Sequence, residues 1–393
     1  MTDAKHRVRF AAALVAATLC LTACSTPAEP AASSTTKTVD EIDAAPSLDT
    51  RLQRMIDAMT PQQKAGQLVI VGLMSSGPSH GIDQMVSEYG IGGVLLLDDW
   101  KNADTILQAV SSLNALTPPG MPGLYMSADQ EGGQIQRVSG TGFDKIPPAT
   151  DQGAMPVDQL TQAASTWGAQ LKTAGINLNL APVADTVPAG FESKNGPIGK
   201  LHREFGTSPD VTGPHAAAFI TGMSSAGEQS CVKHFPGLGR ITGNTDKTAK
   251  GVTDDTTTAT DPYLDAFRAA IAAGPAMVMV SLATYTQIDA DNPAVFSHIV
   301  ITDLLRGKIG WTGVVIADAL DSAAVTAVPV EQRVVRFVQA GGDIVIFTTT
   351  GDAIKAIDGL VAQMGQSPEF NQLVNTSLLR VLRAKYAAGL VTV

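Results

Sequence analysis

Residues 231–246 read CVKHFPGLGRITGNTD, and this stretch decides how the rest of the chain is interpreted. An apolar pair is followed by a cation beside an imidazole, at Lys233 and His234. Pro236 ends the apolar run, because proline lacks a backbone N–H and fixes its own φ. Three glycines follow within seven positions, so the backbone can take turns closed to other residues. The pattern predicts a buried strand that carries Lys233 and His234 to its carboxyl end, followed by a glycine-rich loop.

The glycine spacing does not match a dinucleotide-binding loop. Gly237, Gly239 and Gly243 miss that pattern by one residue, and the Lys-His-Phe-Pro segment interrupts the strand-to-helix turn that the motif requires. A solvated loop is a plain alternative. A metal site has little support, since no second histidine or cysteine lies at ligand spacing. We expect no metal ion and no organic cofactor.

Eight apolar runs, separated by helical or loop stretches, predict the fold. The runs cover residues 67–72, 91–97, 123–129, 176–182, 230–234, 276–282, 313–318 and 343–347. Several are nearly continuous and β-branched, as in parallel strands covered on both faces. Helical patterns begin at Leu48 and recur over 160–174, 215–223, 263–272 and 331–340. This alternation predicts an α/β fold, a (β/α)8 barrel in a single domain over 47–393. A doubly wound open sheet has the same alternation and stays open.

In such a barrel, active residues lie at the carboxyl ends of the strands. Asp129 ends the third run, Lys233 and His234 end the fifth, and Asp318 ends the seventh. A carboxylate at the end of an almost wholly apolar strand is costly to bury unless it has a partner or a task. The alternative for Asp318 is an aspartate that caps the next helix. We expect the strand-end residues to surround one cavity.

The amino end follows the pattern of a bacterial export signal. Basic residues precede an apolar stretch, 10–22, that is too short to span a bilayer in a mature protein. Leu-Thr-Ala-Cys at 21–24 resembles a lipobox, in which Cys24 becomes the lipid-modified first residue. We therefore expect a lipoprotein signal peptide over 1–23 and anchoring to the outer face of the cytoplasmic membrane. Residues 24–46 are rich in Ser, Thr, Ala and Pro and predict a flexible tether. An ordinary secretory signal with a chance cysteine is the alternative.

Composition narrows the function further. The formal net charge is −10 without basic clusters, which argues against a nucleic-acid partner. The three cysteines are Cys20, Cys24 and Cys231, so the body after the signal has one thiol and no internal disulfide. Cys231 lies in an apolar run, where an inert buried thiol is expected.

KHFPG followed by a glycine-rich loop resembles the signature of glycoside hydrolase family 3, in particular its single-domain β-N-acetylhexosaminidases. The resemblance runs from about Leu48 to the C-terminus. SADQEGGQIQR at 127–137 is similar to the family's Asp-Gln-Glu-Gly-Gly-x-x-x-Arg segment, and HREFG at 202–206 to its Arg-x-Phe-Gly element. The resemblance implies a retaining exo-glycosidase that removes terminal β-N-acetylglucosamine from cell-wall fragments. A β-glucosidase of the same family and a catalytically silent sugar-binding lipoprotein stay open.

The same resemblance assigns roles to residues. It makes Asp318 the nucleophile that forms a covalent glycosyl-enzyme, and Lys233 and His234 paired donors for sugar hydroxyls. Glu131 could be a second catalytic carboxylate, although its place beside the glycine turn favours a structural role. The full set implied to bind substrate is Asp129, Arg137, Arg203, Lys233 and His234.

The general acid/base is where this chain departs from the family. Single-domain relatives use an Asp-x-His pair on the loop after KHFPG, and the matching positions here are Asn244 and Asp246. We expect Asp246 to protonate the leaving oxygen and later activate water, with Asn244 orienting it. An ordinary aspartate has a pKa of about 4, so it needs burial or a nearby charge to act near neutral pH. Asp254 and Asp255, otherwise solvated loop charges, are the fallback.

Overall fold

The computed structural model describes residues 46–77 and 80–393. The predicted signal peptide (1–23), the lipidation site Cys24 and the tether as far as residue 45 lie outside the described residues. Within the described ranges, every helix is too short or too polar to cross a membrane.

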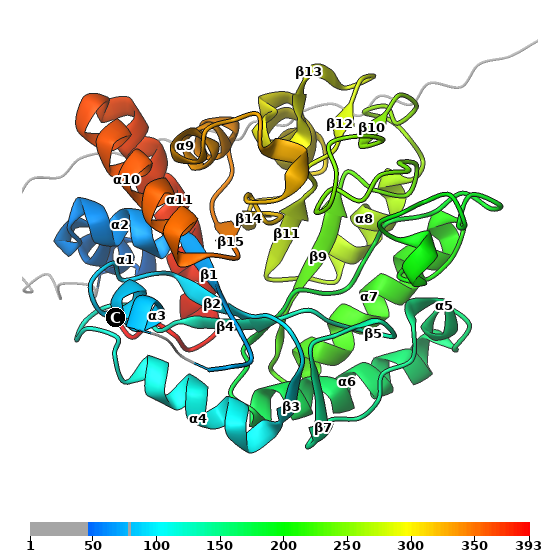
Figure 1. Ribbon diagram of the computed structural model, residues 1–393, viewed down its shortest axis with the longest axis horizontal. Helices are drawn as coiled ribbons and strands as arrows, with labels where there is room; N and C mark the ends of the chain where they lie inside the picture. The colour runs from blue at the N-terminus through cyan, green and yellow to red at the C-terminus, as the bar shows by residue number, and fades with distance from the viewer. Residues whose placement is uncertain (1–45, 78–79) are drawn as a thin grey trace, which may run out of the picture. The chain divides into compact units, whose positions relative to one another are not determined.

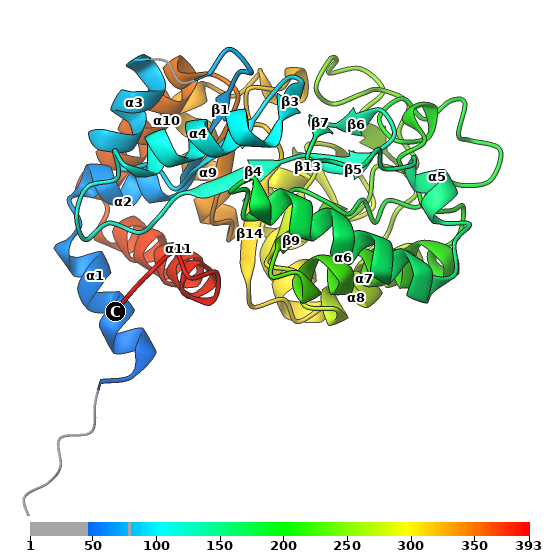
Figure 2. The same cartoon turned by 90° about the horizontal axis from the view of Figure 1, so that it is seen from below.

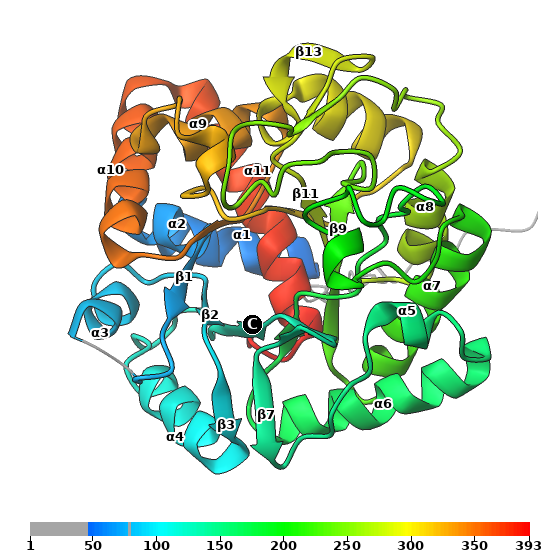
Figure 3. The ribbon, with the colours of Figure 1, turned by 45° about the vertical axis from the view of Figure 1, so that its right-hand side comes forward.

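Eight parallel strands form a closed ring (Figures 1 and 3). Each strand pairs in parallel with the next one along the chain, and the last pairs with the first. A bridge between Ile316 and Ile344 joins the remaining two neighbours. The strands are β1 (Val69–Leu73), β2 (Gly93–Leu96), β4 (Tyr125–Ala128), β8 (Leu178–Asn179), β9 (Gln229–Phe235), β11 (Met277–Val280), β14 (Val314–Ala317) and β15 (Val345–Phe347).

This strand order confirms the predicted barrel and excludes the doubly wound sheet. A doubly wound sheet reverses its strand order at a switch point and keeps two open edges. Here the order follows the chain around the ring, and each of the eight predicted runs overlaps one barrel strand. Nearly all strand residues are buried, which is why the runs are almost continuously apolar.

A helix follows each barrel strand and covers the outside of the ring (Figure 3). The predicted helical patterns correspond to four of these helices and to the opening helix α1 (Leu48–Ala58). One of the eight, η3, has π-helical hydrogen bonding. The eight are α3 (His80–Ser87), α4 (Ala103–Asn114), α6 (Val157–Thr173), α7 (Pro209–Ser225), α8 (Leu264–Ala272), η3 (Ile299–Lys308), α9 (Val330–Ala340) and α10 (Thr350–Gln366).

The last helix, α11 (Pro368–Ala387), closes the amino-terminal end of the barrel and packs beside α1 (Figure 2). Its Lys385 is fully buried and donates from Nζ to Gln67 Oε1 (2.9 Å) and to the Gly123 carbonyl (2.8 Å). Gln67 ends α2 (Pro61–Gln67) just before β1, and Gly123 precedes β4. With this end filled, ligand access is left to the carboxyl ends of the strands.

Short strands in the long βα connections form small sheets apart from the barrel. β3 (Trp100–Asn102) pairs with β7 (Val138–Thr141), and β5 (Gln130–Gly132) pairs with β6 (Ile135–Gln136). A third small sheet joins β10 (Thr253–Asp254), β12 (Thr284–Tyr285) and β13 (Asp289–Pro293). These segments are the insertions expected from the length of the βα stretches.

Candidate active site

A cavity of about 680 Å³ lies at the carboxyl ends of the strands. Its apolar lining comes from barrel positions such as Leu95, Leu180, Met279 and Ile346. All seven candidate catalytic and substrate-binding residues from the sequence line this one cavity: Asp129, Arg137, Arg203, Lys233, His234, Asp246 and Asp318. The expectation that the strand-end residues meet around a common space is therefore confirmed.

Asp318 lies directly after β14, at the edge of the cavity. Its backbone N–H donates to Val280 O of the neighbouring strand (3.1 Å), and its Oδ1 accepts from the N–H of Ala319 (2.9 Å). The next helical turn, η4 (Ala323–Val325), has Ser322 at its N-cap, so Asp318 does not cap it. Burial, and then the negative charge of Asp246, raise the pKa of Asp318 to about 6. Most of this carboxylate is therefore ionised at neutral pH.

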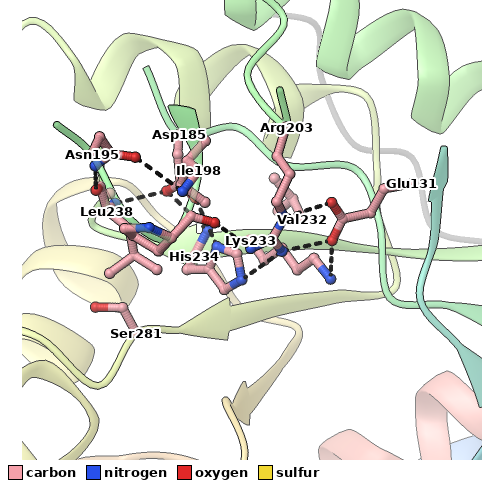
Figure 4. A network of polar contacts seen from close by, with 12 residues as sticks. Glu131, Asp185, Asn195, Ile198, Arg203, Val232, Lys233, His234, Leu238 and Ser281 are labelled. Atoms are coloured by element: carbon pink, nitrogen blue, oxygen red, sulfur yellow. Dashed lines mark hydrogen bonds and ion pairs between the residues drawn. The ribbon is translucent and has the colours of Figure 1, made fainter. Parts of the chain in front are cut away.

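Glu131 holds two cations of the site in place. Its carboxylate accepts two hydrogen bonds from Arg203 (2.8 and 2.7 Å) and lies 2.6 Å from Nζ of Lys233 (Figure 4). Burial alone would raise the pKa of Glu131, but the charges of Arg203 and Lys233 outweigh it and hold the pKa well below its usual range. Its side chain is only 4% exposed and does not line the cavity. This arrangement supports a structural role for Glu131 over a catalytic one.

Asp129 and Arg137 complete the polar wall on this side. Asp129 follows β4, and its Oδ1 lies 2.5 Å from Nζ of Lys233. Arg137 lies between β6 and β7, and its Nε is buried without a hydrogen-bond partner among the described residues. In such a cavity a carboxylate can accept a hydrogen bond from a sugar hydroxyl, and a guanidinium can donate one.

His234 is held by a residue that the sequence interpretation missed. Nδ1 of His234 lies 2.7 Å from Oδ2 of Asp185, which is fully buried (Figure 4). The predicted fourth strand ended at residue 182, so the strand-end rule was not applied to Asp185 three positions later. The four residues before Asp185, Ala-Pro-Val-Ala, are apolar, and that was the available signal. The same rule had selected Asp129 and Asp318.

The glycine-rich loop brings Asp246 to the cavity. Oδ1 of Asn244 accepts from the backbone N–H of Asp246 (2.9 Å), which fixes the local turn. The loop docks on the segment after β14, where the N–H groups of Ala323 and Ala324 donate to carbonyls of Asp246 and Thr245 (3.3 and 3.1 Å). Asp246 itself is exposed at the cavity rim and accepts from Ser322 Oγ (3.4 Å).

The fallback acids do not lie at the site. Asp254 is buried, and its carboxylate accepts hydrogen bonds from the backbone and hydroxyl groups of Thr256 and Thr257. The interpretation of Asp254 as a solvated charge was therefore wrong, because those four donors satisfy it inside the loop. Asp255 lines a different surface hollow, beside Phe191. Neither residue lines the main cavity.

Further cavity residues come from the ends of β14 and β15, where the sequence suggested none beyond Asp318. Asp321 accepts from the N–H of Thr348 (2.8 Å) and from its hydroxyl, and Asp352 also lines this side. Within 46–77 and 80–393, no three His, Cys, Asp or Glu side chains are grouped as a metal site would require. Burial raises the pKa of the Cys231 thiol, so it is not poised as a nucleophile.

Comparisons with known proteins agree with this geometry. Residues 60–384 match the family described as the glycosyl hydrolase family 3 N-terminal domain. The solved β-N-acetylhexosaminidase of Beutenbergia cavernae DSM 12333 is 40% identical with a TM-score of 0.81, over 84% of this chain and 99% of that one. An uncharacterized secreted glycosyl hydrolase of Arthroderma benhamiae is 31% identical over 306 residues, covering 74% of this chain and 84% of that protein. The β-hexosaminidase LpqI of Mycobacterium tuberculosis is 29% identical over 348 residues, 83% of each. The chain therefore belongs to glycoside hydrolase family 3, and it is a glycoside hydrolase built on a (β/α)8 barrel.

Proposed function

We propose that this protein is a retaining exo-β-N-acetylglucosaminidase that acts through a covalent glycosyl-aspartate. The observation that carries the proposal is the meeting of Asp318, Asp246 and the sugar-binding set in one cavity. The hexosaminidase names of the similar proteins support N-acetylglucosamine as the sugar. An apolar floor formed by barrel residues supports attack on a terminal sugar, since a chain cannot thread through the barrel.

The mechanism has two displacements at the anomeric carbon. In the first, a carboxylate oxygen of Asp318 bonds to that carbon while Asp246 gives its proton to the departing glycosidic oxygen. In the second, Asp246 takes a proton from water, whose oxygen displaces Asp318 and restores its carboxylate. Two inversions give net retention of the β configuration. Asp129, Lys233, Arg203, His234 and Arg137 hold the sugar hydroxyls and fix the ring for both steps.

A paired chromogenic assay tests the proposal. We expect kcat/KM for p-nitrophenyl β-N-acetylglucosaminide to exceed that for the β-glucoside by about 100-fold or more, because a site built to hydrogen-bond a group rejects the analogue that lacks it. NMR of the first product should show the β-anomer before mutarotation. Faster hydrolysis of the glucoside would favour the β-glucosidase alternative. Binding of N-acetylglucosamine without hydrolysis of either substrate would favour the silent sugar-binding protein.

We also propose that the protein is exported, anchored through a lipid on Cys24, and acts on peptidoglycan fragments in the cell envelope. The amino-terminal signal pattern supports this, and a secreted relative is consistent with export. We expect the wild-type protein in the membrane fraction and Cys24→Ala in the soluble fraction, with kcat/KM unchanged. Wild-type protein in the soluble fraction, with no lipid mass on Cys24, would point to an ordinary secretory signal instead.

A further inference from the structure

We propose that Asp185 is a positioning residue that sets the tautomer of His234 and anchors the first turn of the loop that carries Asp246. No role for Asp185 followed from the sequence motifs, and it does not line the cavity. The inference deepens the proposed function, because it rests on His234 as a sugar-binding residue. Its central observation is geometric: one buried carboxylate contacts both the imidazole and the loop.

Three hydrogen-bond donors converge on this carboxylate (Figure 4). Oδ2 receives Nδ1 of His234 at 2.7 Å, and Oδ1 receives the backbone N–H groups of His234 (3.2 Å) and Leu238 (2.9 Å). The side chain of Asp185 is fully buried, and that of His234 is 5% exposed. An ionised carboxylate only accepts hydrogen bonds, so Nδ1 of His234 must carry the hydrogen.

The opposite ring nitrogen of His234 faces a donor. Nε2 lies 3.5 Å from Nη2 of Arg203, and a guanidinium only donates. Arg203 is fixed in turn by its two hydrogen bonds to Glu131. Nε2 therefore carries the lone pair, and its long 3.5 Å contact with Arg203 can be exchanged for a hydrogen bond from a bound group. His234 would accept a hydrogen bond from a sugar hydroxyl, while Lys233 donates one. In this proposal His234 accepts and Lys233 donates, whereas the sequence resemblance implied that both residues donate.

The same carboxylate restrains the loop. Leu238, whose N–H is bound to Asp185, lines the cavity eight residues before Asp246. Asn195 holds the next stretch, because its Nδ2 donates to the carbonyls of Leu238 (2.7 Å) and Ile241 (2.8 Å). Asp185 and Asn195 thus both hold the loop backbone by hydrogen bonds. Of these two residues, Asp185 also contacts the imidazole of His234. That difference provides a matched control.

Asp185→Asn keeps the size of the side chain and replaces one acceptor by an NH2 group. If the NH2 faces the two backbone N–H groups, both of those bonds are lost. If it faces Nδ1, the ring must move its hydrogen to Nε2, and the acceptor in the cavity is lost. Wrong-tautomer variants of a histidine general base lose about 10⁴-fold. Since His234 binds rather than transfers protons, we expect a 10- to 100-fold loss of kcat/KM, of the order seen when an orienting partner is removed.

The decisive measurement is ¹⁵N NMR of the imidazole of His234 in the full, folded protein. We expect the Nδ1–H tautomer in the wild type and in Asn195→Ala, and the Nε2–H tautomer in Asp185→Asn. Asn195→Ala should lose stability and activity through the loop alone. In a His234→Asn background, Asp185→Asn should cost less than in the wild type, since the two side chains act together.

An Nε2–H tautomer in the wild type would overturn the inference. So would an unchanged tautomer in a folded Asp185→Asn variant in which the backbone N–H groups of His234 and Leu238 keep their protection from hydrogen exchange, because the NH2 group then faces Nδ1. If that variant does not fold, the wild-type spectrum still tests the tautomer. The spectra need no substrate, so the test of Asp185 stays separate from the test of glycosidase activity. A protein inactive on every glycoside but with the expected tautomers would refute the proposed function alone.

Discussion

Asp318→Ala is expected to reduce kcat on an aryl N-acetylglucosaminide by roughly 10⁴-fold or more, the scale at which loss of a nucleophile is measured. The reason lies in its position. The carboxylate stands at the end of a buried strand in the cavity, with a pKa of about 6, so it is ionised at neutral pH. Alanine leaves nothing to bond the anomeric carbon. The measurement is kcat and KM with purified wild type and variant, at equal folding by circular dichroism.

Chemical rescue and covalent labelling test whether Asp318 is the nucleophile. Small azide or formate ions can enter the space vacated by the carboxylate, and they should restore part of the activity with inverted product. A 5-fluoro N-acetylglucosaminyl fluoride should add one sugar mass to a wild-type peptide that contains Asp318. Asp255→Ala is the matched control, an exposed aspartate outside the cavity, and should keep wild-type rates. Label on a peptide without Asp318, or a loss of less than tenfold, would remove Asp318 as the nucleophile.

The barrel was predictable because its strands are buried on both faces. Such strands are nearly continuous apolar runs, and their number and alternation with helices restrict the topology. Their ends were less predictable. The fourth run was expected over 176–182, but the strand is only Leu178–Asn179. Pro182 has no N–H to donate to a sheet, and apolar composition alone does not reveal where pairing stops.

The candidate site followed from the sequence to the extent that its residues end strands or belong to a motif. Asp129, Lys233 and Asp318 end strands, and the loop motif gave Asp246. Side-chain contacts between different strands could not be predicted, since sequence spacing does not say which buried side chains meet. Glu131 illustrates this point: its role depends on Arg203, 72 residues away, and on Lys233. Asp185 meets His234 across 49 residues for the same reason.

Asp246→Asn should affect the two chemical steps according to the leaving group. An amide cannot donate a carboxylic proton, so a substrate with a poor leaving group, such as the N-acetylglucosamine disaccharide, should lose about 10²- to 10⁴-fold in kcat/KM. A 2,4-dinitrophenyl glycoside needs no proton on its leaving group, so its first step should be nearly unchanged. Its second step lacks a base, so the glycosyl-enzyme should accumulate and give a burst of dinitrophenol.

The same variant has a signature in the pH profile. The charge of Asp246 is one of the causes that raise the pKa of Asp318 to about 6, the larger one being burial. Ionised Asp318 is required, so wild-type kcat/KM for the dinitrophenyl substrate, whose first step needs no proton from Asp246, should fall below about pH 6. Removing the negative charge lowers that pKa, and the acid limb measured with the dinitrophenyl substrate should move to lower pH. Lys250→Ala, exposed on the same loop, should shift neither the limb nor the leaving-group dependence. Equal losses on good and poor leaving groups, with an unmoved acid limb, would exclude Asp246 as the acid/base and leave it as a loop residue near Ser322.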